Sequence, residues 1–102
     1  MIDFPRPLSS TRRVISHGSR GVSIVAANSP LSSAALIPAC SVAVVDTTGA
    51  GDALAGALLY GESCNLDPID SARRAVRIAA EVVTITGARL DPERVRAVWN
   101  QL

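Results

Sequence analysis

Two aspartates and a Gly-Ala-Gly turn stand together in the stretch "VVDTTGAGDALAGALL", residues 44–59. A β-branched apolar run precedes them, and an alanine- and leucine-rich run typical of a helix follows. A strand that ends in a glycine turn and opens into a helix presents unpaired backbone N–H groups to an anion. The N–H groups of Gly49, Ala50 and Gly51 are therefore placed to converge on a phosphate oxygen.

Asp52 follows this turn directly, so a bound phosphate would repel its carboxylate unless the acid has a chemical role. In one interpretation it accepts the proton of a substrate hydroxyl while that oxygen attacks phosphorus and the glycine N–H groups stabilise the transferring group. In the other, Asp52 only stabilises the start of a helix and the glycines only form a tight turn. The residue pattern by itself leaves both interpretations open.

Composition excludes several alternatives. The 102 residues allow one domain at most, and ten basic against nine acidic residues give a net charge of +1, which predicts neither a nucleic-acid nor a membrane partner. All ten basic residues are arginines, so a lysine Schiff base and the lysine of a Walker-type phosphate loop are excluded. The start of the chain lacks the apolar run of a signal peptide, and no segment is apolar enough to span a membrane, so a cytoplasmic protein is predicted.

The two cysteines do not suggest a metal centre. Cys40 and Cys64 have no C-x-x-C spacing, and His17 is the one histidine of the chain. We interpret both cysteines as reduced, small apolar residues and predict no metal held by protein side chains.

Local patterns predict the elements that position the glycine turn. "RVIS" at residues 13–16 and "GVSIVA" at 21–26 read as strands joined by the turn "HGSRG", which is typical of a hairpin. "ALIPAC" at 35–40 suggests a short extended piece ended by Pro38, and residues 41–45 suggest a β-branched strand that leads into the glycine turn. The predicted class is therefore α/β, with short strands followed by helices.

Three helices are expected after the turn. The first covers residues 50–60, carries Leu54, Ala57 and Leu58 on one face, and ends at Gly61. The second begins with Asp67 as N-cap and Pro68 as its first residue, and Gly87 closes the segment that ends it. The second helix is expected to carry a buried stripe of Ile69, Ala72, Val76, Ala79 and Val83. A second Asp-Pro pair opens the terminal helix, with Val95, Val98 and Trp99 facing inward.

The segment "DTTGAGDALAG", residues 46–56, resembles the D-T-x-G-A-G-D signature of the ribokinase/PfkB family of sugar and nucleoside kinases. "SHGSRGV", residues 16–22, is similar to the T-x-G-x-x-G turn that this family places near the ATP phosphates. "LIPA" before the expected strand and "AVRIAAEVVTITGA" near the end also follow the family's order. The resemblance covers only the C-terminal third of the family's length, so residues 1–102 are predicted to form part of a ribokinase-like three-layer kinase domain, with residues 1–13 as an unplaced lead.

The resemblance implies a set of site residues and cofactors. Asp52 would be the catalytic base, and the helix at 75–82 would border the adenine of ATP. Magnesium would accompany the ATP, and a potassium ion would lie beside the anion hole. The implied sets are Gly49, Ala50 and Gly51 for the anion hole, Ser16, Gly18 and Gly21 for the nucleotide, and Asp46, Thr48, Val82 and Gly87 for the monovalent cation.

The leading hypothesis is ATP-dependent phosphoryl transfer to a hydroxyl of a sugar or nucleoside. The family's N-terminal glycine-pair motif, its sugar-binding lid and its N-x-x-E motif have no counterpart here. An alternative is therefore a non-catalytic fragment that binds a nucleotide or another anion, and a third is an α/β domain whose glycine turn is empty. A sheet cut from its neighbouring strands would also expose an edge through which the chain self-associates.

Overall fold

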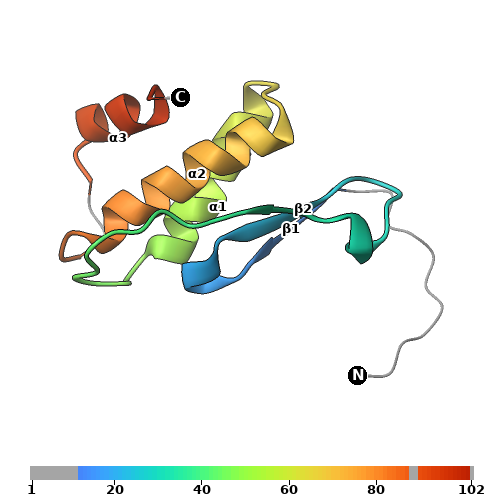
Figure 1. Cartoon of the computed structure of the whole chain (residues 1–102). Coiled ribbons are helices and arrows are strands. Elements are labelled where there is room, and N and C mark those ends of the chain that lie inside the picture. The colour runs from blue at the N-terminus through green and yellow to red at the C-terminus, as the bar shows by residue number, and fades with distance from the viewer. Residues whose placement is uncertain (1–11, 88–89, 102) are drawn as a thin grey trace.

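The computed structural model describes residues 12–87 and 90–101, so the lead expected at residues 1–13 lies outside the described residues except for its last two positions. Over the described residues an antiparallel three-stranded sheet is followed by three α-helices, which confirms the predicted α/β class (Figure 1). The strands are β1 Arg13–Ser16, β2 Val22–Val25 and β3 Ala35–Ile37, and the 3-10 turns are η1 Gly18–Arg20 and η2 Leu31–Ser33. The helices are α1 Ala50–Ser63, α2 Pro68–Val83 and α3 Pro92–Trp99.

The predicted hairpin is confirmed. β1 pairs antiparallel with β2, with Ser16 opposite Val22, and the His17 N–H donates to the Gly21 carbonyl at 2.8 Å to close the turn. β2 also pairs antiparallel with β3, which places Val22 opposite Ile37 and makes the short extended piece the third strand.

Gly21 is required by the backbone around it. Its φ of 103° lies in the left-handed region that favours glycine. A Cβ atom at this position would lie 2.7 Å from the Ala39 nitrogen and 2.9 Å from the Pro38 carbonyl carbon. Any side chain would therefore push the end of β3 away from the hairpin turn.

The prediction of a strand over residues 41–45 is wrong, because these residues form no strand in the structure. Its β-branched residues have the right propensity, but a strand also needs a neighbour, and no strand in the described part of the chain pairs with this segment. Val44 and Val45 are each 62% exposed as a consequence.

The first helix begins at Ala50 as predicted but continues past Gly61 to Ser63. Gly61 is buried inside α1, where it lies against Ser71 of α2 and Trp99 of α3. The prediction that Gly61 ends the helix is therefore wrong, because the missing side chain serves close helix packing instead of a C-terminal cap.

The start of α2 is as predicted. The Asp67 side chain accepts hydrogen bonds from the N–H groups of Ile69 at 3.1 Å and Asp70 at 3.4 Å, and Pro68 occupies the first turn. α2 packs against α1, α3 and the sheet strands β2 and β3 (Figure 1). The core cluster joins sheet and helix and consists of Val22, Ile24, Ile37, Ala72 and Val76, with Leu54, Leu58 and Ile69 packed against it.

The terminal helix α3 also begins with the predicted Asp-Pro pair, although the Asp91 side chain accepts no capping hydrogen bond. Val98 is 1% exposed and anchors α3 in the interior. Trp99 meets the Tyr60 ring edge-on, with ring centroids 5.2 Å apart, and the Arg74 guanidinium lies 5.5 Å from the Trp99 ring centre. These contacts tie the last turns of α1 and α3 to the side chain of Arg74 in α2. Within the described residues, no helix is both long and apolar enough to cross a membrane.

Candidate functional site

The glycine turn has the geometry of an anion-binding helix start. Gly49 is the N-cap of α1 with φ 79° and ψ 0°, a left-handed conformation that suits glycine. The Ala50 N–H donates to the Thr47 carbonyl at 3.2 Å, which removes one of the three donors predicted for the anion hole. The N–H groups of Gly49 and Gly51 have no partner in the part of the chain that the structure describes. They remain available where the helix dipole favours a negative charge.

A cavity of about 540 Å³ opens beside this turn. Its wall includes Ser16, Gly18 and Gly21 of the hairpin turn and Ala50 and Gly51 at the start of α1. The structure thus brings two separately predicted groups, the nucleotide turn and part of the anion hole, to one cavity. The α2 helix closes another side, with Val76, Ala79, Ala80 and Val83.

The lining of this cavity is uncharged. No arginine, lysine, histidine, aspartate or glutamate is among the described residues that line it. An anion bound here would be held by backbone N–H groups and the α1 dipole, because no cationic side chain faces it. Asp52 lies in the first turn of α1, is exposed, and is not part of the lining.

Asp46 ties the glycine turn to the segment that follows α2. Its Oδ1 accepts hydrogen bonds from the Thr48 N–H at 2.9 Å and the Thr48 hydroxyl at 2.6 Å, and its Oδ2 accepts one from the Gly87 N–H at 3.1 Å. These bonds, led by that of the Thr48 hydroxyl, lower the pKa of the Asp46 carboxyl below its usual 3.8. The Val45 and Asp46 N–H groups also donate to the Val83 carbonyl, at 2.7 and 3.1 Å.

The residues implied for a monovalent cation are brought together only in part. Asp46, Thr48 and Gly87 form one hydrogen-bonded group. Val82 contributes a buried side chain, 3% exposed, and its carbonyl accepts from the Ile85 N–H at 3.3 Å. Both carboxylate oxygens of Asp46 already accept hydrogen bonds from the protein, two at Oδ1 and one at Oδ2. Within residues 12–87 and 90–101, no group of three or more His, Cys, Asp or Glu side chains is arranged to hold a metal ion.

Several residues of the site were not predicted from the sequence. Thr47 lines the cavity and its carbonyl holds Ala50, and the segment expected to be a strand supplies Ser41, Val42 and Val44 to the wall. The available signal was sequence proximity, because these residues immediately precede the glycine turn.

The cysteines and the histidine lie as follows. Cys40 and Cys64 are free, as predicted, and both are exposed. His17 lies in the hairpin turn next to Gly18, and its Nε2 is 2.7 Å from the Ser23 hydroxyl.

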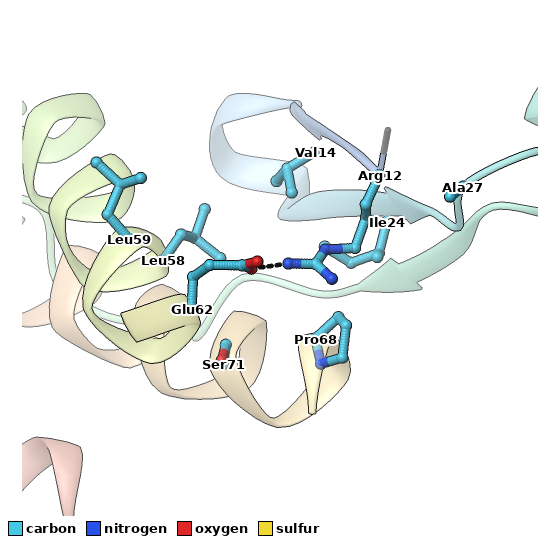
Figure 2. A pocket seen from close by; sticks show the side chains of 9 residues that line it. All are labelled: Arg12, Val14, Ile24, Ala27, Leu58, Leu59, Glu62, Pro68 and Ser71. Atoms are coloured by element: carbon cyan, nitrogen blue, oxygen red, sulfur yellow. Dashed lines mark hydrogen bonds and ion pairs between the residues drawn. The ribbon is translucent and has the colours of Figure 1, made fainter. Parts of the chain in front are cut away.

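A further cavity of about 460 Å³ lies between the sheet and the helices, and it contains none of the predicted site residues (Figure 2). An ion pair joins Arg12, the residue before β1, to Glu62 in the last turn of α1 across this cavity. Its remaining lining is largely aliphatic and includes Val14, Ile24, Leu58 and Leu59. The two charges neutralise each other, so this cavity offers no free charge to a ligand.

Comparison with known proteins assigns the chain and its fold to a family. The model of the pfkB family carbohydrate kinases matches residues 8–94, and the chain belongs to that family. The α/β arrangement is that of its ribokinase-like structural neighbours. No curated protein sequence matches the chain.

Solved structures with the same fold are sugar and nucleoside kinases. Ribokinase from Thermotoga maritima matches with a TM-score of 0.73 and 27% identity over 86% of this chain and 29% of its own. A nucleoside kinase from Burkholderia thailandensis in complex with inosine matches with 0.72 and 27% identity over 87% and 30%. Aminoimidazole riboside kinase from Salmonella enterica, complexed with aminoimidazole riboside and an ATP analogue, matches with 0.71 and 29% identity over 89% and 32%. This chain therefore spans about a third of the length of these enzymes.

Proposed function

We propose that this chain supplies the nucleotide-binding and catalytic-base portion of a PfkB-type kinase, which transfers the γ-phosphate of ATP to a hydroxyl of a sugar or nucleoside in the cytoplasm. The portion corresponds to the C-terminal third of such a kinase. The observation that carries the proposal is the cavity that joins the hairpin turn of residues 16–21 to the glycine turn at the start of α1. The family match and the sugar and nucleoside kinases with the same fold support the substrate class.

In this proposal the phosphates of ATP would lie along the two turns. Magnesium would be carried by the nucleotide, because no carboxylate is among the described residues that line the cavity. The free N–H groups at Gly49 and Gly51 and the α1 dipole stabilise negative charge on the transferring group. The small residues Ala79 and Ala80 leave room for the adenine ring of ATP against α2. The site therefore binds and orients the nucleotide through its backbone, without a lysine.

Asp52 acts as the general base. Its carboxylate takes the proton of the acceptor hydroxyl while the bond from that oxygen to the γ-phosphorus forms and the bond to the leaving ADP oxygen breaks. Asp52 is exposed in the first turn of α1, so its carboxylate is accessible to an acceptor that arrives from solvent.

The second candidate function is a module that binds a nucleotide or anion without catalysis. The observation that favours it is the position of Asp52, which stands outside the cavity lining. Catalysis also needs the acceptor hydroxyl held near attack distance, and such positioning supplies roughly 7–11 kcal/mol of barrier reduction. We therefore expect the chain by itself to release no ADP from ATP in response to ribose, fructose or nucleosides, assayed with magnesium and potassium.

A chimeric protein separates the two functions. In it, this chain replaces the segment of T. maritima ribokinase that it matches, so the remaining 71% of that enzyme, 100 minus 29, supplies the acceptor region. Asp52→Asn in the chimera should lower kcat about 10²- to 10⁴-fold and leave ATP affinity nearly unchanged. Asp70→Asn is the matched control, because Asp70 is also an acid in the first turn of a helix. A kcat of Asp52→Asn equal to that of Asp70→Asn would remove Asp52 from the mechanism.

A further inference from the structure

The cavity beside the Arg12–Glu62 ion pair is separate from the candidate nucleotide site. Its volume of about 460 Å³ lies within the roughly 300–1,000 Å³ typical of small-molecule pockets. Among the described residues, the two cavities share no lining residue, and they adjoin opposite ends of α1. Leu58 borders this cavity, whereas Gly51 borders the other. A molecule bound here would therefore not compete with a nucleotide at the glycine turn.

An unpartnered hydroxyl group belongs to the wall of this cavity. Ser71 of α2 is 4% exposed, and its Oγ has no hydrogen-bond partner in the part of the chain that the structure describes. The Ser71 N–H donates to the Asp67 carbonyl at 2.9 Å, so the unsatisfied group is the hydroxyl. Figure 2 shows Ser71 on α2, beside the last turns of α1. A buried hydroxyl without a partner destabilises the protein until a ligand or a water molecule supplies one.

Helix packing does not account for this hydroxyl. α1 approaches Ser71 through Gly61, where an added Cβ would lie 2.7 Å from Ser71 Cβ, so the contact requires a small side chain. Ala72 and Ala75 are fully buried in the same helix and show that a methyl group is sufficient for close packing there. The serine therefore adds a polar group that the contact between α1 and α2 does not need.

The rest of the wall determines the chemistry of a ligand. Its side chains are mainly aliphatic, and its two charges are paired, because Arg12 and Glu62 form an ion pair with side chains that are 33% and 62% exposed. An ionic ligand would separate this pair and leave one of its charges without a partner. An uncharged aliphatic molecule would leave the pair intact, and one hydroxyl group on it would satisfy Ser71, which can both donate and accept a hydrogen bond.

We propose that this cavity binds an uncharged aliphatic alcohol, whose hydrocarbon chain lies between the sheet and α1 and whose hydroxyl is hydrogen-bonded to Ser71 Oγ. The proposal gives the chain a second ligand site and is independent of the proposed kinase function. The two ends of α1 then bind different chemistry, an anion at the first turn and a neutral alcohol at the last.

1-Hexanol is a suitable probe, and amide NMR of the isotope-labelled chain locates it. We expect saturable shifts of the Leu58, Leu59 and Ser71 amides with a Kd on the order of 1 mM, which is typical of a ligand with about seven heavy atoms. The amides of Gly49 and Gly51 should not shift. Shifts confined to the glycine turn would overturn the proposal. So would no saturable shift up to about 50 mM, roughly fifty times that Kd, which would assign a water molecule to Ser71.

Ser71→Ala tests the hydroxyl. It should weaken the binding of 1-hexanol about five- to tenfold, while the melting temperature of the ligand-free chain stays constant or rises, because no hydrogen bond within the protein is lost. Ser63→Ala is the matched control, because Ser63 Oγ donates to the Tyr60 carbonyl at 2.7 Å and does not line the cavity. Equal affinities of the two variants for 1-hexanol would contradict the proposal. A melting temperature of Ser71→Ala lowered by more than about 5 °C would also contradict it, because the hydroxyl would then have a structural role.

The charge of the ligand provides an independent test. Hexanoate and hexylammonium carry nearly the same chain as 1-hexanol, and each should bind at least about tenfold more weakly, because either one separates the ion pair. Glu62→Gln removes the charge that neutralises Arg12 and should reverse the preference, so that hexanoate binds more tightly than 1-hexanol. Hexanoate that binds the unchanged protein as tightly as 1-hexanol, or a Glu62→Gln protein without the reversal, would overturn the assignment of a neutral ligand.

Discussion

The two ends of α1 differ in what surrounds their glycines. At the beginning, Gly51 borders the cavity, and a Cβ added there would meet nothing within 4 Å. Near the other end, Gly61 is buried, and an added Cβ would lie 2.7 Å from Ser71 Cβ and 3.4 Å from the Trp99 ring. Gly51 therefore leaves open space beside the cavity, whereas Gly61 is needed because Ser71 and Trp99 already fill the space where a side chain would lie.

This difference separates binding from stability along one helix. The closed end joins α1, α2 and α3 through Gly61, Ser71 and Trp99. The open end leaves backbone N–H groups unpaired beside a cavity, a cost that folded proteins tolerate where a ligand binds. Substitutions at the two ends should therefore change different measured quantities.

The largest expected effect is on stability, at the closed end. Gly61→Ala should lower the free energy of unfolding by about 1–3 kcal/mol, because the new methyl group forces α1 away from Ser71. Gly56→Ala is the matched control in the same helix: it is exposed with nothing within 4 Å, so it should raise the stability by about 0.5–1 kcal/mol. Urea denaturation measures both. Equal effects of the two variants would contradict the filled contact at Gly61.

The next effect is on affinity, at the open end. An added Cβ at residue 51 meets nothing within 4 Å, and the branched side chain of Gly51→Val would take up space at the cavity wall. The substitution should therefore weaken ATP binding about tenfold or more, which corresponds to ~1.4 kcal/mol. Gly56→Val is the matched control. It introduces the same side chain elsewhere on α1, at a residue that does not line the cavity, and should leave the ATP affinity unchanged. Calorimetry with magnesium and ATP compares them. An unchanged affinity of a folded Gly51→Val protein would show that phosphate does not bind at this turn.

The smallest effect is the response of the turn to acid. Because hydrogen bonds from Thr48 and Gly87 lower the pKa of Asp46 below 3.8, its ionised carboxylate contributes fully above that pH. The contribution is lost as the pH falls through the lowered pKa of the folded state. The amide signals of Thr48 and Gly87 should therefore stay constant down to about pH 4 and titrate together below 3.8.

Asp46→Asn should abolish this joint titration while the signals of α2 stay in place. A midpoint at or above 3.8, or separate midpoints for the two amides, would contradict the tether between the glycine turn and the segment after α2.

Local signals predicted the parts of the fold that depend on neighbours in sequence. The hairpin of residues 13–25, the start of α1 at Ala50 and the Asp67 cap all rest on interactions within a few residues, and the structure contains each of them. The strand at 41–45 failed because pairing needs a partner that the local sequence does not reveal.

Gly61 shows the same limit in a side-chain contact. A glycine after an apolar run is typical of a helix end, and only the packing of Ser71 and Trp99 shows that it belongs inside the helix. The turn at residues 49–51 could be predicted from its own residues, whereas the cavity beside it depends on how the hairpin, α1 and α2 meet in three dimensions.

The most direct measurement of the central claim is a titration of the isotope-labelled chain with magnesium and a non-hydrolysable ATP analogue, followed by amide NMR shifts. The account predicts saturable shifts at Gly49, Gly51 and Asp52 and at the hairpin turn, and unchanged signals at Gly61 and Cys64, at the far end of the same helix. Shifts confined to the residues around the Arg12–Glu62 ion pair, or no saturable shift at the start of α1, would contradict it.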